Sequence, residues 1–381
     1  MSHLPSDNTL FIGLMSGTSL DGVDGVLAAF PRDFSHGHID TLAAAYIPFP
    51  AALQTDLMLL QAAGENEIHR EALVANTLTQ HYAECAARLL AQTNTQCTSI
   101  RAIGVHGQTI RHQPALGYTR QTNNPALLAE LTGIDVIADF RSRDIAAGGQ
   151  GAPLVPAFHR ALFADSEQTR VVVNIGGIGN ISVLKSGKTG RVIGFDTGPG
   201  NVLMDAWIEQ HLNKKYDTDG AWAASGTIIP ALLDKLRAEP FFAMPPPKST
   251  GRDLFHPAWL AARLNSFPDA KPVDVQATLA AFTATTLADA IAHHAADAQA
   301  IYVCGGGAYN RHLMRQLQQA LADRKHAATM EKSDALGIAP NHVEALAFAW
   351  LAHRFSQRLP GNLSAVTGAK GLRILGALYP A

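Results

Sequence analysis

Short apolar runs alternate with small polar turns in the first part of the chain. The runs Leu10–Leu14 and Val23–Phe30 flank a segment of Gly, Ser, Thr and Asp. Two apolar runs around such a turn predict a β-hairpin. Further strands are predicted at 41–47, 103–105 and 134–138, and a helix at 71–90.

The same pattern starts again near residue 171. Val171–Val173 and Ile181–Leu184 flank a glycine-rich turn, and a third apolar run, Val192–Phe195, ends at Asp196. A further strand, Ile301–Cys304, runs into three glycines, and a helix is predicted after Asn310. A hairpin that recurs about one domain length later predicts a duplicated α/β fold.

Glycine and proline clusters indicate where the chain divides. The segment 148–153 predicts a hinge, with an N-terminal lobe at 1–150 and a C-terminal lobe at 151–381. Three consecutive prolines after Met244 exclude a helix interior there. A long amphipathic helix is predicted after Asp274, with this aspartate as its N-cap.

Composition narrows the class of protein. The 381 residues are 47% hydrophobic and 16% charged, with a net charge of −2 and no basic cluster. This balance favours a compact soluble protein over a nucleic-acid or anionic-membrane binder. Three scattered cysteines form no disulfide framework or metal spacing, and the first ten residues do not resemble a signal peptide. We therefore expect a cytoplasmic protein.

The first hairpin turn has the residues of a phosphate-binding loop. Gly17 lets the backbone approach a ligand, and the N–H and hydroxyl groups around it can donate to phosphate oxygens. Asp21 is a candidate ligand for Mg²⁺, which favours one or two carboxylates beside phosphates. The alternative is an ordinary hairpin turn, which uses the same residue types.

Two other glycine turns have the same ambiguity. Gly176 and Gly177 open a strand instead of a helix, which disfavours a dinucleotide-binding fingerprint, and no Walker A lysine follows. Gly305–Gly307 can leave room for a nucleoside or form a plain strand-to-helix turn. The order of the three turns, one hairpin in each lobe and then a nucleoside turn, is that of two-lobed actin-like ATPases and sugar kinases. We therefore expect an ATP cleft between duplicated ribonuclease H-like domains.

Polar residues follow several predicted strand ends. Asp196 is a candidate general base, or a cap for a helix that begins near Asn201. His106, Gln108 and Arg141 are candidates for holding a polar substrate, with surface pairing as the alternative for the arginine. His293 and His294 are predicted on a solvated helix surface, and His112, His159 and His342 show no metal spacing.

Several segments resemble one known family. Gly13–Asp24 resembles the opening signature of the anhydro-N-acetylmuramic acid kinases, and Asn174–Gly177 and Gly194–Asn201 resemble their second phosphate and catalytic segments. Four later stretches also resemble family segments: Lys248–Arg252, Cys304–Gly307, Val343–Ala345, and Asn362–Leu363 with Val366–Ala369. The resemblance covers Phe11 to Tyr379, nearly the whole chain.

The resemblance implies a reaction in which ATP and water convert 1,6-anhydro-N-acetylmuramic acid into N-acetylmuramic acid 6-phosphate and ADP, recycling cell-wall peptidoglycan. It implies that Asp196 activates the water, that Arg141 meets the lactyl carboxylate and that Glu344 contacts the sugar. The predicted cofactors are ATP and Mg²⁺. The residues predicted to bind the nucleotide are Gly17, Thr18, Ser19, Leu20, Asp21, Gly22, Val23, Asp24, Gly176, Gly177, Gly305, Gly306 and Gly307.

Two alternatives remain open from the sequence. One is a kinase of related fold that phosphorylates another sugar without opening a ring. The other is an actin-like or chaperone-like ATPase, although such proteins usually carry an added domain, which we do not expect beyond Ala381. The oligomeric state is also open, with a homodimer as one candidate.

Overall fold

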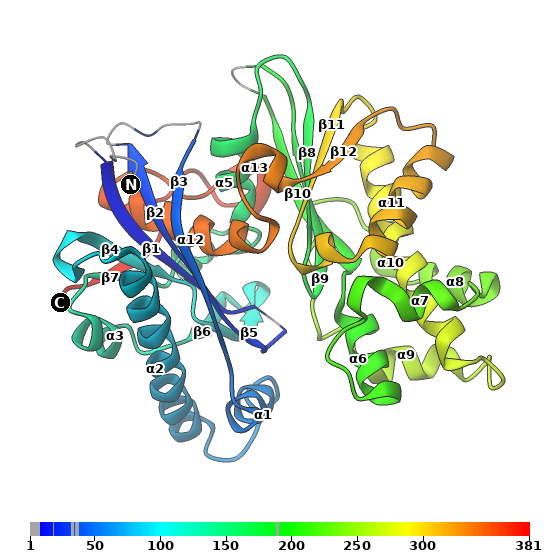
Figure 1. Ribbon diagram of the computed structural model, residues 1–381, viewed down its shortest axis with the longest axis horizontal. Helices are drawn as coiled ribbons and strands as arrows, with labels where there is room; N and C mark the ends of the chain where they lie inside the picture. Colours follow the sequence, from blue (N-terminus) through cyan, green and yellow to red (C-terminus); the bar gives the residue numbers. More distant parts are fainter. Residues whose placement is uncertain (1–7, 18, 32–33, 35–37, 188–189) are drawn as a thin grey trace. The chain divides into compact units, whose positions relative to one another are not determined.

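The chain forms two compact α/β units (Figure 1). The computed structural model describes residues 8–17, 19–31, 34, 38–187 and 190–381. Unit 1 comprises Met1–Leu162 and His342–Ala381, and unit 2 comprises Phe163–Asn341. This division differs from the predicted one at 150/151, because the last forty residues belong with the first unit and the segment 148–153 lies inside it.

Unit 1 is built on a sheet with strand order β13-β7-β4-β1-β2-β3. Its strands are β1 (Asn8–Met15), β2 (Gly22–Pro31), β3 (Asp40–Pro48), β4 (Ile100–Val105), β7 (Val136–Ala138) and β13 (Ala377–Tyr379), with a separate hairpin of β5 (Gln108–Gln113) and β6 (Tyr118–Thr122). Its helices are α1 (Ala51–Leu59), α2 (Glu67–Thr93), α3 (Pro125–Thr132), α4 (Ser142–Ala146), α12 (Val343–Ser356) and α13 (Ser364–Thr367), while α5 (Val155–Phe163) ends at the unit boundary. The 3₁₀ turns are η1 (Cys97–Ser99) and η2 (Pro114–Leu116), and η7 (Pro340–His342) crosses to unit 1.

Unit 2 has a sheet with strand order β10-β9-β8-β11-β12. Its strands are β8 (Arg170–Ile175), β9 (Ile178–Leu184), β10 (Val192–Pro199), β11 (Ala300–Cys304) and β12 (Thr329–Lys332). Its helices are α6 (Val202–Leu212), α7 (Ala221–Ser225), α8 (Pro230–Arg237), α9 (Pro257–Leu264), α10 (Pro272–His294) and α11 (Arg311–Asp323), with 3₁₀ turns η3 (Thr218–Gly220), η4 (Pro240–Ala243), η5 (Gly306–Tyr309) and η6 (Ser333–Leu336).

The two sheets repeat one topology. In unit 1, β1 pairs antiparallel with β2 and parallel with β4, and the order β3-β2-β1-β4-β7 results. In unit 2, β8 pairs antiparallel with β9 and parallel with β11, which gives the corresponding order β10-β9-β8-β11-β12. The predicted duplication of a ribonuclease H-like fold is therefore confirmed, and the hairpin turns after β1 and β8 occupy equivalent places.

Glycines let helix α12 lie directly on the sheet of unit 1. Gly13 of β1 is paired with Gly104 of β4, so both face the same side of the sheet. A Cβ at Gly13 would collide with the carbonyl oxygen of Ala345, and one at Gly104 with that of Phe348. Gly25 faces the opposite side, where an added Cβ would lie 2.5 Å from Sγ of Cys85 in α2. The C-terminal helix is thus an integral layer of unit 1, which explains why the chain returns to that unit.

Helix α10 is the central helix of unit 2. It packs in a core with Val173, Ile181 and Phe195 of the sheet. The helix begins at Pro272 after Lys271, so the prediction that Asp274 caps it was wrong. A proline in the first turn has no N–H that needs a cap, and Asp274 instead accepts a hydrogen bond from the backbone of Thr227 at 2.7 Å.

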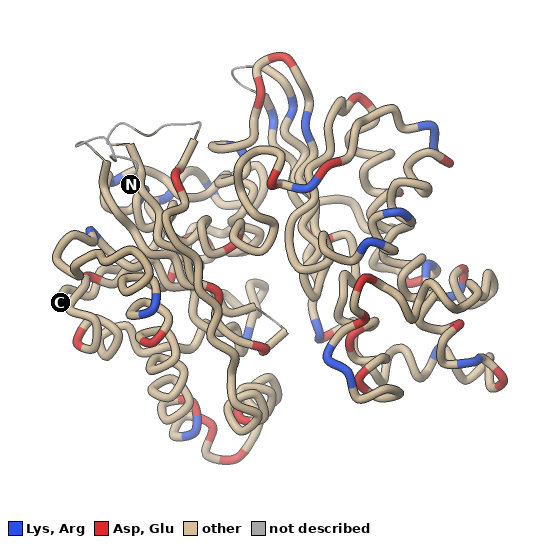
Figure 2. The backbone as a smooth tube through the Cα atoms, viewed as in Figure 1, with Lys and Arg blue, Asp and Glu red and all other residues tan. Residues whose placement is uncertain are grey.

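Helix α10 is also the one described helix that is long and apolar enough to cross a membrane by composition, but 78% of that stretch is buried inside the protein. Acidic and basic residues are interspersed over both units (Figure 2).

A buried histidine in unit 1 makes stability depend on pH. His353 is 1% exposed and stacks on Phe30 with ring centroids 4.9 Å apart, and Phe11 and Phe34 lie edge-on to it. Burial, reinforced by the charge of Arg354, lowers the pKa of His353 from 6.5 to about 4. Between these values the unfolded chain binds a proton that the folded chain does not, so stability falls as the pH falls.

Replacement of His353 by phenylalanine should remove this dependence. From pH 7 to pH 5 we expect the wild type to lose about 2 kcal/mol more unfolding free energy than His353→Phe, because the variant has no imidazole to protonate. Urea denaturation at the two pH values measures the difference. His69→Gln, at an exposed histidine, is the control. Equal losses in the wild type and His353→Phe would contradict the prediction.

Candidate active site

The first predicted phosphate loop joins β1 to β2 in unit 1. Ser16 is buried, with its Oγ 2.6 Å from the hydroxyl of Tyr82 in α2, and it donates to the carbonyl of Gly107 at 3.2 Å. Leu20 closes the turn with its N–H on the Gly17 carbonyl at 3.3 Å. Thr18 lies outside the described residues, so its predicted role is not addressed by the structure. The predicted hairpin is confirmed, and the loop is anchored to α2.

The predicted substrate residues His106 and Gln108 lie beneath this loop. Both are buried, at the end of β4 and the start of β5. Gln108 Nε2 donates to the Gly17 carbonyl at 3.0 Å, and His106 Nδ1 lies 3.4 Å from the Ser16 carbonyl. Both side chains therefore contact the loop directly.

Arg141 holds His106 from the other side. Its Nε and Nη2 lie 3.1 and 2.9 Å from His106 Nε2, and its Nη1 donates to the Gly151 carbonyl at 2.8 Å. Burial, followed by the charge of Arg141, lowers the pKa of His106 well below its usual value. The imidazole is therefore neutral at physiological pH.

Carboxylates gather where β2 meets α12. Asp21 is exposed immediately before β2, where Ser19 Oγ donates to its Oδ1 at 2.6 Å, and Glu344 lies in the first turn of α12. Burial, then the charges of Asp21 and Glu344, raise the pKa of Asp24 from 3.8 to about 7. Carboxylate oxygens whose negative charges repel one another are suited to bind a hard cation, because the cation neutralises that charge.

No group of three or more His, Cys, Asp or Glu in the described part of the chain has the arrangement of a complete metal site. Magnesium often takes only one or two protein carboxylates, with the remaining positions filled by phosphate and water. The donors at Asp21 and its neighbours therefore fit Mg²⁺ bound together with a nucleotide.

The second predicted phosphate turn joins β8 to β9 in unit 2. The Gly176 carbonyl accepts from the N–H of Asn201 at 2.8 Å, and the Gly177 carbonyl accepts from the N–H of Gly200 at 2.9 Å and of Val202 at 3.0 Å. A Cβ at Gly200 would collide with the Gly176 carbonyl. The segment after the catalytic candidate Asp196 thus supports the turn through close backbone contact.

The three-glycine turn follows β11, next to β8. Gly305 has φ +80°, and a Cβ there would collide with Oδ1 of Asn174, while Gly307 packs against Ile175. Gly306 is exposed and faces open space. Because β11 pairs with β8 as far as Cys304 and Asn174, the three-glycine turn and the second predicted phosphate turn lie at the same end of the sheet.

Asp196 sits on β10 in a row that crosses the sheet. Its register partner is Asn180 of β9, which in turn faces Asn174 of β8. Its N–H donates to the Lys248 carbonyl at 3.2 Å, and its Oδ2 accepts from the N–H of Thr250 at 2.9 Å. The carboxylate is therefore fixed in orientation, and the helix α6 that follows has no side-chain cap at Asn201.

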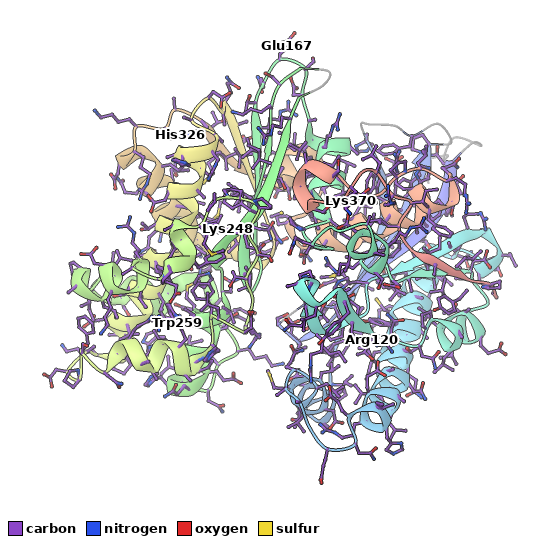
Figure 3. The ribbon with its side chains drawn as sticks, turned by 180° about the vertical axis from the view of Figure 1, so that it is seen from behind. Arg120, Glu167, Lys248, Trp259, His326 and Lys370 are labelled. Atoms are coloured by element: carbon purple, nitrogen blue, oxygen red, sulfur yellow. The ribbon has the colours of Figure 1, made fainter. Side chains whose placement is uncertain are left out.

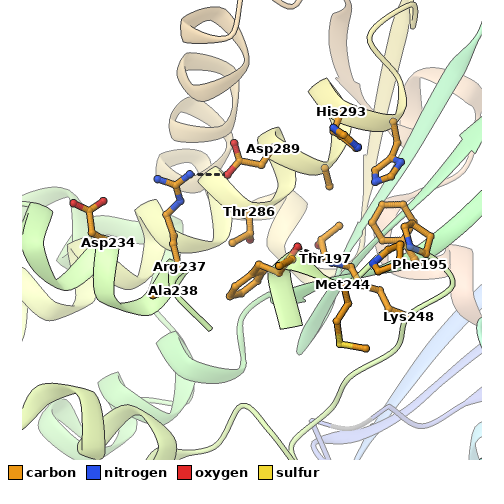
Figure 4. A pocket seen from close by; sticks show the side chains of 16 residues that line it. Phe195, Thr197, Asp234, Arg237, Ala238, Met244, Lys248, Thr286, Asp289 and His293 are labelled. Carbon is orange, nitrogen blue, oxygen red and sulfur yellow. Dashed lines mark hydrogen bonds and ion pairs between the residues drawn. The ribbon is translucent and has the colours of Figure 1, made fainter. Parts of the chain in front are cut away.

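The other side of β10 borders a cavity of about 750 Å³. Phe195 and Thr197 line it together with Arg237, Asp289 and Lys248, and Asp196 is not among its lining residues (Figure 4). Three of its charged side chains have partners within the protein. Arg237 pairs with Asp289 at 3.0 Å, and Lys248 Nζ donates to the carbonyls of Phe241 and Phe242 at 3.1 and 3.2 Å.

The sequence did not single out the roles of Lys248, Thr250 and His294. Lys248 lies beside the unit 2 sheet (Figure 3), with its ammonium 4.6 Å from the centre of the Phe241 ring. His294 is half-buried, and the centre of its ring lies 4.8 Å from that of Phe195. The prediction that it lies on a solvated helix surface was therefore wrong. His293 is exposed, as predicted. The sequence indicated Lys248–Arg252 as a segment that resembles the family. It did not predict that this segment contacts Asp196, because that contact depends on the fold.

Comparison with known proteins identifies the family. The family model for anhydro-N-acetylmuramic acid kinase matches residues 9–381. This chain belongs to the anhydro-N-acetylmuramic acid kinase family. It is 58% identical over 376 residues to the anhydro-N-acetylmuramic acid kinase of Cupriavidus pinatubonensis, covering 97% of this chain and 98% of that one. It is 56% identical to that of Burkholderia orbicola strain MC0-3, covering 99% and 97%.

Solved structures with a similar chain path include two proteins of low identity. The activator of 2-hydroxyisocaproyl-CoA dehydratase from Clostridium difficile has a TM-score of 0.48 at 13% identity, covering 92% of this chain and 97% of that one. A ROK family glucokinase from Streptomyces griseus has a TM-score of 0.41 at 12% identity, covering 91% and 99%. As a member of its family, the protein is a kinase, a phosphotransferase that uses ATP.

The glycine turn offers a matched pair of substitutions. Gly305→Ala should lower the unfolding free energy by about 1–3 kcal/mol, because the residue has positive φ and its Cβ meets Asn174. Gly306→Ala faces open space and should change it by less than about 0.5 kcal/mol. Chemical denaturation measures both. Equal effects at the two positions would show that the strain at Gly305 is not what the structure implies.

Proposed function

We propose that this kinase acts on 1,6-anhydro-N-acetylmuramic acid in the cytoplasm and couples opening of the anhydro bridge to phosphorylation of O6. The products would be N-acetylmuramic acid 6-phosphate and ADP, so the reaction would return cell-wall sugar to metabolism. The near full-length match at 58% identity, together with the fixed carboxylate of Asp196, is the observation that carries the proposal.

Asp196 would act as the general base. A water oxygen attacks C1 while Asp196 takes one of its protons, and the C1–O6 bond breaks with its electrons going to O6. The other proton stays on the new C1 hydroxyl. O6 then attacks the γ-phosphorus of ATP, and ADP leaves with the electrons of the broken P–O bond. The hydrogen bond from Thr250 to Oδ2 would hold the carboxylate in the orientation for proton transfer.

The glycine turns would bind the nucleotide. Phosphoryl transfer depends on positioning and charge neutralisation more than on covalent chemistry, which suits backbone N–H groups held by fixed turns. We assign phosphate contacts to the loop at Gly17 and the turn at Gly177, and the nucleoside to Gly305–Gly307. Asp21 would hold Mg²⁺, with Asp24 and Glu344 near it, and the cation would supply positive charge beside the phosphates. Glu344 remains a predicted sugar contact.

Product analysis tests the reaction. Protein incubated with ATP, Mg²⁺ and 1,6-anhydro-N-acetylmuramic acid should give a product heavier than the sugar by one water and one phosphoryl group. Mass spectrometry measures this directly. Addition of a phosphoryl group without water would instead indicate a sugar kinase that leaves the ring closed. ATP hydrolysis that needs no sugar would indicate a different class of ATPase.

Asp196→Asn tests the base. The amide oxygen of asparagine can still accept from Thr250 N–H, so the local fold should persist while proton abstraction is lost. We expect kcat to fall by about 10²–10⁴-fold with the affinity for ATP nearly unchanged. Calorimetric titration and an ADP-release assay measure the two quantities. Asp234→Asn, at an exposed carboxylate of α8, is the control, and near-normal turnover of Asp196→Asn would remove the assigned role.

A further inference from the structure

We propose that His106, Gln108 and Arg141 are positioning residues that hold the carbonyls of Ser16 and Gly17, so that the Gly17 N–H faces away from them and can bind phosphate. This inference rests on the proposed function of that loop as a phosphate site. It gives the three residues a place beneath the nucleotide instead of the direct sugar contact that the sequence suggested.

The two buried side chains act on consecutive carbonyl groups. The amide of Gln108 donates to the Gly17 carbonyl at 3.0 Å, and the imidazole of His106 lies 3.4 Å from the Ser16 carbonyl. In a trans peptide, the C=O and the following N–H point in opposite directions. Drawing the Ser16 carbonyl toward His106 therefore turns the Gly17 N–H to the other side of the loop, where it is available to an anion.

Arg141 determines which nitrogen of His106 carries the proton. Two guanidinium N–H groups, on Nε and Nη2, converge on His106 Nε2. Guanidinium is only a donor, so Nε2 must accept and the proton must lie on Nδ1. In this tautomer Nδ1–H donates to the Ser16 carbonyl, and a relay runs from Arg141 through His106 to the loop.

The position of Gln108 supports a dedicated role. The residue is 0% exposed, and its Oε1 has no hydrogen-bond partner among the described atoms. A buried oxygen without a hydrogen bond costs free energy, and an apolar side chain at this position would avoid that cost. The hydrogen bond from Nε2 is therefore what favours an amide here. That group donates to Gly17.

The equivalent turn of unit 2 achieves the same orientation by other means. There, the carbonyls of Gly176 and Gly177 are held by backbone N–H groups of residues 200–202. In both units the carbonyls of the hairpin turn are bound by the protein, and the intervening N–H faces the other way. Unit 1 uses the two side chains together with the N–H of Leu20, and unit 2 uses the backbone.

A matched pair of amide-to-acid substitutions tests the role of Gln108. Gln108→Glu replaces the donor by a carboxylate that faces the Gly17 carbonyl, whereas Gln121→Glu changes an amide on β6 whose Nε2 donates to the hydroxyls of Thr109 and Thr119. We expect the Kd of a non-hydrolysable ATP analogue to rise about tenfold or more in Gln108→Glu. The Kd of the anhydro sugar should be unchanged in both variants, and Gln121→Glu should bind the analogue normally.

The two Kd values distinguish failure of the positioning role from failure of the proposed function. A rise in the sugar Kd with normal binding of the analogue would overturn the positioning role and restore direct sugar contact. Equal rises in both constants would also overturn it. If the wild type binds no ATP analogue at all, the proposed function fails instead. If thermal unfolding shows that Gln108→Glu does not fold, Gln108→Met serves as a second variant, because it removes the donor without adding charge. We expect it to raise the Kd of the ATP analogue in the same way.

Nitrogen NMR of labelled histidine tests the relay itself. The His106 signal, identified by its loss in His106→Asn, should show the Nδ1–H tautomer in the wild type. Arg141→Met removes both donors to Nε2, so the preference for this tautomer should relax and the Kd of the ATP analogue should rise several-fold with the sugar Kd unchanged. An Nε2–H tautomer in the wild type, a spectrum unaffected by Arg141→Met, or a rise confined to the sugar Kd would overturn the relay.

Discussion

The orientation of a few peptide carbonyls in two hairpin turns is the constraint on which the rest of the site depends. A backbone that is to present N–H groups to an anion must bind its own carbonyl oxygens elsewhere. In unit 2 these carbonyls accept from the backbone of residues 200–202, and in unit 1 they are bound by two buried side chains and the N–H of Leu20. The surrounding elements, α2 behind Ser16 and α6 behind Gly177, hold these partners in place.

The repeated topology explains why the two turns correspond. Each follows the first strand of a sheet with the same strand order, so each lies at the end where the parallel strands also terminate. Candidate ligand-binding groups therefore gather there in each unit: the carboxylates around Asp24 in unit 1, and the glycines after β11 in unit 2. The raised pKa of Asp24 reflects burial together with like charge, an arrangement that a bound cation would relieve.

The second requirement is that backbone segments pack directly against each other at glycines, where no side chain separates them. Gly13 and Gly104 let α12 approach the sheet, which brings Glu344 near Asp24. Gly200 and Gly305 play the comparable part in unit 2, where backbone lies against backbone or against Asn174. These contacts explain why glycine is needed at these positions. A single added methyl group there would displace a neighbouring element.

The sequence by itself predicted most strands of the two main sheets and both hairpins, because alternation of apolar residues and turn chemistry are local properties. Its motifs indicated the family by resemblance and Asp196 as the candidate base. It did not predict the strands β5, β6, β12 and β13. It did not determine that residues 342–381 return to unit 1, because that depends on how α12 fits the glycines of distant strands. Nor did it show that Lys248 and Thr250 fix Asp196, or that His106 and Gln108 hold the Gly17 loop. Those contacts join residues about fifty to ninety positions apart, and only the tertiary structure, which decides which strand ends become neighbours, brings them together.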